Sequence, residues 1–113
     1  MSENLQDQTC KACEGYEDPL TESDIEAFKT RVHTEWTVSE DTKRIKRSFS
    51  FPNFASALEF VNTVGEIAEK EGHHPDIELT YGNVVVHLST HSIGGLSEND
   101  FIMAAKIDEQ YDS

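Results

Sequence analysis

The chain of 113 residues is poor in basic side chains, with 9 Lys and Arg against 22 Asp and Glu, and its formal net charge is −13. Such an acidic surface repels a polyanion, because proteins hold DNA and RNA largely through Lys and Arg contacts to phosphate. An anionic membrane surface is disfavoured for the same reason. We therefore expect no direct binding to nucleic acid or to a membrane, and a small molecule or another protein as the partner.

The sequence also lacks a long apolar run, since none approaches the roughly 18 residues that a membrane span needs. Its first residues, MSENLQDQT, have neither the basic nor the apolar region of a signal peptide. These two absences favour a cytoplasmic protein.

Cysteine is scarce as well, because Cys10 and Cys13 are the only two and form a single C-x-x-C pair. A mononuclear zinc site needs four ligands, and the sequence has no second pair. A thioredoxin-type pair would lie between a strand and a helix, whereas this one lies in a polar N-terminal segment. We assign the pair no chemistry.

The length favours one domain. Residues 1–19 show no periodicity and are interpreted as a polar N-terminal arm, with a single domain over 20–113. Three segments have helical apolar spacing. The first follows Thr21, with Asp24 at the capping-box position, and the third follows Ser97, with Asp100 at the same position.

The second helix is expected between Asn53 as its N-cap and Gly72 just past its end. Its predicted inner face consists of Phe54, Ala57, Leu58, Val61, Val64, Gly65 and Ala68.

Alternating residues around 36–51 and 77–88 predict two hairpins. Arg44 and Lys46 have the opposite parity to Phe49 and Phe51, so we interpret the basic cluster at 43–47 as solvent-facing side chains of a strand. The element order α-β-β-α-β-β-α predicts an α+β fold, a four-stranded antiparallel sheet with helices packed on one face.

The second hairpin makes a prediction about its histidines. A Gly82-Asn83 loop of type II′ pairs Ile77 with Leu88 and, extended further, sets His74 opposite His91. It also sets His87 opposite Glu78, on the face away from the core, so His87 is expected to be exposed. His73 and Glu69 lie close in sequence to His74 and are expected in the same corner.

Three interpretations of such a corner are possible: a metal site, a site of proton transfer, or surface histidines without a functional role. A single metal is awkward for His73 and His74, because adjacent residues of an extended chain point to opposite faces. Proton transfer suits the cluster better, since imidazole titrates near pH 6.5 and neighbouring groups can hold one ring neutral and another protonated.

The segment EKEGHHPDIELTYGNVVVHLSTHSIGGLSENDF resembles the signature of the pterin-4a-carbinolamine dehydratases. The similarity extends upstream through Trp36, IKRSFSF and NFASALEFVNTVGEIAE, and covers nearly the whole chain. The signature positions are Glu69, His73, His74, Pro75, Tyr81, His91 and Asp100.

The resemblance implies dehydration of a 4a-hydroxytetrahydropterin to a quinonoid dihydropterin, which recycles the cofactor of aromatic amino acid hydroxylases. It implies no metal and no organic cofactor, and a homodimer or homotetramer. His73, His74 and His91 are the implied catalytic residues, with His73 and His91 as acid and base. The implied substrate-binding residues are Glu69, His74, Pro75 and Asp100.

The family also contains non-catalytic members, which act as a transcriptional cofactor or as a Rubisco assembly factor. A scaffold of that kind is the alternative function. The three clustered histidines favour the enzyme, because a scaffold needs no clustered titratable groups.

Overall fold

A computed structural model describes residues 5–10 and 18–112 of the chain. The helices are α1 (Glu22–Lys29), α2 (Phe54–Glu71) and α3 (Glu98–Asp112), and the strands are β1 (Thr37–Val38), β2 (Ile45–Ser50), β3 (Asp76–Thr80) and β4 (Asn83–Leu88). Two short 3-10 helices are η1 (Leu5–Asp7) and η2 (His91–Ile93). No helix in the described ranges is long and apolar enough to cross a membrane.

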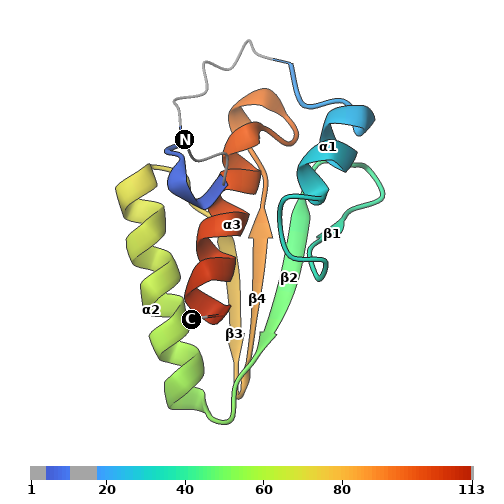
Figure 1. Ribbon diagram of the computed structural model, residues 1–113. Coiled ribbons are helices and arrows are strands. Elements are labelled where there is room, and N and C mark those ends of the chain that lie inside the picture. Colours follow the sequence, from blue (N-terminus) through green and yellow to red (C-terminus); the bar gives the residue numbers. More distant parts are fainter. Residues whose placement is uncertain (1–4, 11–17, 113) are drawn as a thin grey trace.

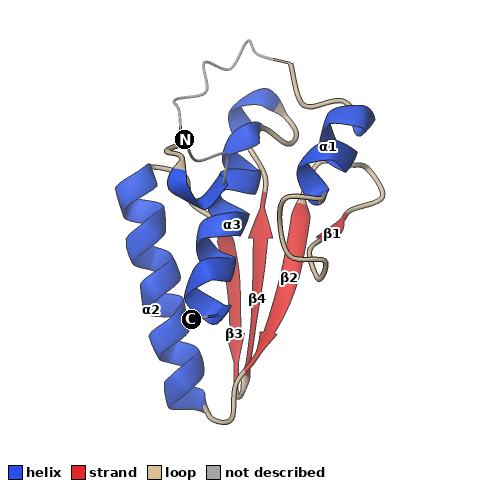
Figure 2. Cartoon of the chain, viewed as in Figure 1, coloured by secondary structure: helices blue, strands red, loops and turns tan. Residues whose placement is uncertain are grey.

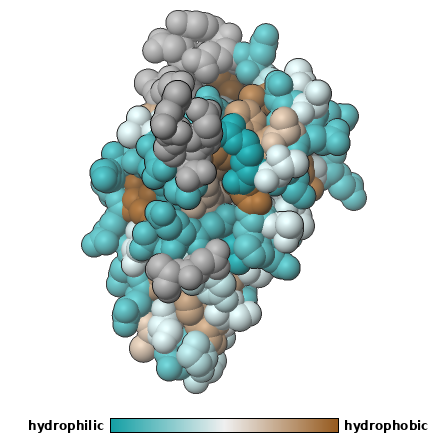
Figure 3. Space-filling model, viewed as in Figure 1, coloured by the Kyte–Doolittle hydropathy of each residue, from teal (hydrophilic) through white to brown (hydrophobic). Residues whose placement is uncertain are grey.

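The strands form one antiparallel sheet in the order β1-β2-β4-β3, and the helices lie on one of its faces (Figures 1 and 2). This arrangement confirms the predicted α+β fold and element order. Viewed from the helical side, the surface is mainly hydrophilic, with separate hydrophobic patches (Figure 3).

The helix ends follow from local chemistry. Thr21 accepts a hydrogen bond from the Asp24 backbone and its own N–H donates to the Asp24 carboxylate, which confirms the capping box of α1. The Asn53 side chain accepts from the Ser56 N–H at the start of α2. Gly72 ends that helix with φ +67°, a left-handed conformation that costs glycine little.

The inner face of α2 differs from the prediction. Its buried residues are Ala57, Phe60, Val64 and Ala68, whereas Phe54 and Leu58 keep 43% and 41% of their surfaces exposed. The apolar band of this helix is wider than its contact with the sheet. The helix is rotated so that the Phe60 ring packs on Phe49, with ring centroids 4.8 Å apart.

The predicted register of the β3–β4 hairpin is wrong by two residues. Thr80 pairs with Asn83, Leu79 with Val84 and Ile77 with Val86, so the loop is Tyr81-Gly82. A type II′ turn needs positive φ at its first loop position, but here Gly82, with φ +73°, is the second. Its carbonyl accepts a hydrogen bond of 2.9 Å from the Phe51 N–H, which ties the loop to the end of β2.

A shift of two residues leaves every side chain on its predicted face, because the side-chain period of a strand is two. Ile77, Leu79 and the three buried residues of β4 still face the helices. The predicted pairing of His74 with His91 does not form, because His74 precedes β3 and His91 lies in η2.

Arg44 and Lys46 are exposed, as predicted, but Arg47 lies in the core. It shares the parity of Phe49, and its guanidinium lies over the Phe49 ring at 4.5 Å from the centroid. Its Nη1 is 2.5 Å from Asp108 Oδ1, an oxygen that also accepts a 2.8 Å hydrogen bond from the Trp36 indole. A buried charge with its counter-ion thus joins β2 to α3.

Residues 5–10 of the predicted arm pack against the domain. Leu5 is buried in the core cluster, and the Gln6 carbonyl accepts a hydrogen bond from Lys106 Nζ on α3. The Cys10 N–H donates to Glu71 Oε1 at the end of α2. This segment therefore covers the end of the molecule where α2 stops and α3 begins.

Candidate active site

The segments that carry the signature residues other than Tyr81 meet at one end of the sheet: the end of α2, the loop after β4 and the start of α3 (Figure 1). Glu69 lies in the last turn of α2, and His73, His74 and Pro75 form the link from that helix to β3. His91 follows β4, and Asp100 lies in the first turn of α3. Antiparallel strands and the helices packed on them bring these three separate segments to the same end of the sheet.

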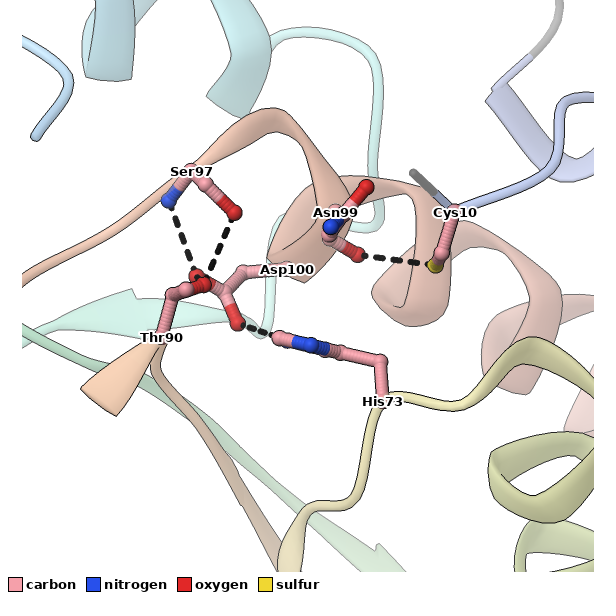
Figure 4. A network of polar contacts seen from close by, with 6 residues as sticks. All are labelled: Cys10, His73, Thr90, Ser97, Asn99 and Asp100. Atoms are coloured by element: carbon pink, nitrogen blue, oxygen red, sulfur yellow. Dashed lines mark hydrogen bonds and ion pairs between the residues drawn. The ribbon is translucent and has the colours of Figure 1, made fainter. Parts of the chain in front are cut away.

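The best-defined contact of the site joins His73 to Asp100 (Figure 4). His73 Nε2 is 2.6 Å from Asp100 Oδ1; the histidine side chain is 12% exposed and the aspartate side chain is fully buried. The two residues are 27 positions apart. A buried carboxylate on one ring nitrogen fixes the orientation of the imidazole and leaves the other nitrogen, Nδ1, for a ligand.

Asp100 is itself held by two further donors. Its Oδ2 accepts from the Thr90 hydroxyl at 2.8 Å and from the Ser97 N–H at 2.9 Å. The Ser97 hydroxyl lies 2.7 Å from Thr90 Oγ1 and must be the donor in that contact, because the single Thr90 proton goes to Asp100. An ionised Asp100 has no proton to donate, so in that state His73 donates its Nε2 proton to Oδ1 (Figure 4).

The loop after β4 holds His91 next to this network. Thr90 and Gly95 form an isolated bridge, with the Thr90 N–H donating to the Gly95 carbonyl at 2.8 Å. Gly94 turns the chain with φ +70°. His91 is exposed and lines a cleft of about 270 Å³, together with Thr90, Asp41, Lys43 and Arg44 among others.

His74 has a different environment from His73. Its Nε2 is 2.6 Å from Glu69 Oε2, and both side chains are mainly exposed, at 61% and 80%. Pro75 is half-buried directly before β3. The predicted corner thus contains an oriented, half-buried imidazole and an exposed imidazole–carboxylate pair beside it.

The remaining histidines lie elsewhere. His87 faces away from the core, as predicted, but it is half-buried because its Nε2 bonds Glu78 Oε2 across the outer face of the sheet. His33 is exposed after α1. Within residues 5–10 and 18–112, no three His, Cys, Asp or Glu side chains are placed to hold a metal ion.

The sequence reasoning did not identify Thr90, and it assigned Ser97 only to the helix cap. Both act through contacts that form only when the chain is folded. No pattern in the residues next to Thr90 indicates its role. Cys10 also reaches this end of the molecule, where its Sγ lies 3.7 Å from the Asn99 carbonyl (Figure 4). Cys13 is outside the described residues.

Comparison with known proteins gives consistent results. A family model described as "Pterin 4 alpha carbinolamine dehydratase" matches residues 18–110. A protein of Alkaliphilus metalliredigens is 45% identical over 107 residues, which are 95% of this chain and 96% of the relative. One of Halorhodospira halophila is 49% identical over 105 residues, which are 93% and 95% of the two chains. Both are named "Putative pterin-4-alpha-carbinolamine dehydratase".

Solved structures agree. The transcriptional coactivator/pterin dehydratase of Brucella melitensis superposes with a TM-score of 0.78 at 34% identity, over 83% of this chain and 99% of that one. A pterin dehydratase-like protein identified as a RuBisCO assembly factor in the alpha-carboxysome shares the fold, with a TM-score of 0.62 at 22% identity over 72% and 94% of the two chains. Because the family model spans most of the chain and the relatives match it from end to end, the protein belongs to the pterin-4a-carbinolamine dehydratase family.

Proposed function

We propose that the protein dehydrates a 4a-hydroxytetrahydropterin to the quinonoid dihydropterin, with His73 and His91 as the groups that exchange protons. Family membership supports a pterin as the substrate. The observation that carries the proposal is the 2.6 Å contact between the half-buried His73 Nε2 and Asp100, a buried carboxylate already held by Thr90 and Ser97. A scaffold has no need of an imidazole oriented in this way.

The reaction needs one acid and one base. The bond between C4a and the hydroxyl oxygen breaks, and the oxygen leaves as water once it has been protonated. N5 gives up its proton, and the C4a–N5 double bond forms. Imidazole suits both tasks, because its pKa lies near the working pH and proton transfer is most efficient there.

The surroundings of each histidine suggest its role. His73 is bound through Nε2, so Nδ1 is the nitrogen that can take or give a proton at the pterin. His91 is exposed at the cleft beside Thr90 and supplies the second group. The exposed Glu69–His74 pair binds and orients the ring, with Pro75 next to it. Asp100 is fully buried and acts through His73, as a positioning residue.

A stopped-flow assay tests the proposal. A purified hydroxylase generates the carbinolamine in the observation chamber. The disappearance of the carbinolamine is followed by absorbance, with and without the purified protein. We expect the protein to accelerate the loss in proportion to its concentration. A rate equal to the spontaneous one, from a protein shown to be folded, would refute the enzyme and leave the non-catalytic scaffold as the function.

Asp100→Asn tests the positioning role separately. The amide still accepts from Thr90, but its NH₂ group donates to His73 Nε2, which moves the imidazole proton to Nδ1. We expect turnover to fall roughly ten- to hundredfold, with little change in KM. The ¹⁵N chemical shifts of the His73 ring should report the exchanged tautomer. An unchanged tautomer together with lost activity would contradict this role.

A further inference from the structure

The exposed basic residues of this acidic chain are concentrated at one place. Lys43, Arg44 and Lys46 are three of its nine Lys and Arg, and all three are exposed at the β1–β2 hairpin. The net charge of −13 gives the rest of the surface a field that repels anions. Arg31 and Lys70 are exposed elsewhere in the described ranges, but this hairpin is where three exposed cations lie within four residues, so it is the most favourable of these places for an anion.

The hairpin borders the candidate active site. Lys43 and Arg44 line the same cleft of about 270 Å³ as His91 and Thr90. Arg44 also lines a second cleft, of about 200 Å³, with Lys46, His87, Ser39 and Thr37 among its walls. The side chain of Arg44 thus joins the two clefts, and a cationic edge runs from His91 onto the outer face of the sheet.

The cations on this edge are not neutralised by ion pairs. Within the described part of the chain, neither Lys43 nor Arg44 forms an ion pair with a carboxylate. The Arg44 side chain makes one long polar contact, 3.5 Å from Nη1 to His87 Nδ1. The guanidinium therefore retains donors for an anionic oxygen, which it binds with two of them at once.

Asp41 also borders the His91 cleft, and its charge interacts with those of Lys43 and Arg44 without forming an ion pair with either. One carboxylate oxygen accepts from the Ser39 hydroxyl at 2.6 Å and from the Lys43 N–H at 3.0 Å. These two hydrogen bonds, and after them the positive charges of Lys43 and Arg44, lower the pKa of Asp41 below its ordinary value. The carboxylate thus stays ionised at neutral pH and holds the hairpin in the shape that presents Lys43 and Arg44.

We propose that Lys43 and Arg44 bind a negatively charged group on the 6-substituent of the pterin, a phosphate or a carboxylate. This inference rests on the proposed function and adds to it the class of pterin. With the pterin ring between His73 and His91, a substituent that passes His91 meets the hairpin. Selectivity for that substituent resides in two side chains that take no part in the proton transfers.

Equilibrium binding of stable dihydropterins tests the inference without turnover. Three ligands share the ring and differ at C6: one has a neutral trihydroxypropyl group, and two carry a terminal phosphate or carboxylate. Each is titrated by calorimetry into the wild-type protein, Lys43→Gln, Arg44→Gln and Lys29→Gln. Lys29 lies on α1, so its variant is a matched control for the loss of one positive charge.

We expect the phosphate-bearing ligand to bind about five- to tenfold more tightly than the neutral one at low salt, and the carboxylate by a smaller factor. Lys43→Gln and Arg44→Gln should remove that advantage and leave the neutral ligand unchanged, while Lys29→Gln should leave all three unchanged. Equal affinity of the wild-type protein for charged and neutral ligands would overturn this inference but leave the proposed function intact. An advantage that also disappears in Lys29→Gln would overturn it too, because a general field would then explain it. Failure of all three ligands to bind would overturn the proposed function as well.

Discussion

Replacing His73 with alanine should lower the turnover number for the carbinolamine about 10²- to 10⁴-fold, the usual contribution of a positioned general acid or base. The affinity for a dihydropterin should change much less, because the ring is held by other contacts. His73 is the imidazole whose orientation the fold specifies, through the buried carboxylate of Asp100. Single-turnover kinetics measure the chemical step, and calorimetry with a dihydropterin measures binding.

Variants of the other two site histidines should differ in whether turnover or binding is lowered more. His91→Ala should resemble His73→Ala, with turnover affected more than binding. His74→Ala should mainly weaken binding, since its exposed pairing with Glu69 suits an orienting contact. His33→Ala is the matched control, because this exposed histidine lies outside the site. Equal losses of turnover and affinity in all three site variants would contradict the proposed roles.

The largest loss of stability is expected from Asp108→Ala. The substitution leaves the Arg47 guanidinium buried without its counter-ion and removes the acceptor of the Trp36 indole N–H and of the His33 N–H. Arg47 is 4% exposed, so water replaces little of what is lost. Breaking a buried ion pair on one side costs about 3–5 kcal/mol. In a domain of this size, Tm should fall by roughly 10–20 °C.

Two comparisons make that prediction specific. Glu78→Ala removes a carboxylate that pairs with His87 on the outer face of the sheet, where the Glu78 side chain is 65% exposed, and should cost less than about 1 kcal/mol. The double variant Arg47→Met, Asp108→Ala removes both charges and should recover much of the loss. Thermal unfolding followed by circular dichroism measures all three. A double variant as unstable as Asp108→Ala would show that the unpaired charge is not responsible, and that lost packing or the unsatisfied Trp36 and His33 donors are.

The elements that depend on neighbouring residues could be predicted from the sequence. Thr21, Asn53 and Gly72 specify helix ends through contacts within a few positions, and all three lie where they were expected. Features that depend on distant partners could not be predicted in this way. Phe60 is buried because Phe49 and Tyr111 offer it a surface, and neither is near it in the chain. Arg47 was predicted to face solvent with the other basic residues, but it lies in the core, where its partner Asp108 is 61 positions away.

In the candidate site, too, some residues could be predicted from the sequence and others could not. The resemblance supplied His73, His91 and Asp100, but no local pattern joins residues 27 positions apart. Thr90 became identifiable only when the loop after β4 placed its hydroxyl on Asp100. The basic residues at 43–47 were interpreted as one solvent-facing set. In the fold they separate into a buried arginine that stabilises the domain and exposed cations beside His91.

The hairpin of β3 and β4 has a consequence for folding. Two registers, two residues apart, bury the same apolar side chains, so hydrophobic burial cannot distinguish them. The choice depends on backbone groups at a single loop, where the Phe51 N–H donates to the Gly82 carbonyl and a side chain on Gly82 would meet the Phe51 carbonyl oxygen at 3.0 Å. The slipped hairpin is therefore a competing state of nearly equal burial. The bond from Phe51 to Gly82 forms only when the end of β2 is in place, so docking of β2 adds to the preference of the Tyr81-Gly82 turn for the observed register.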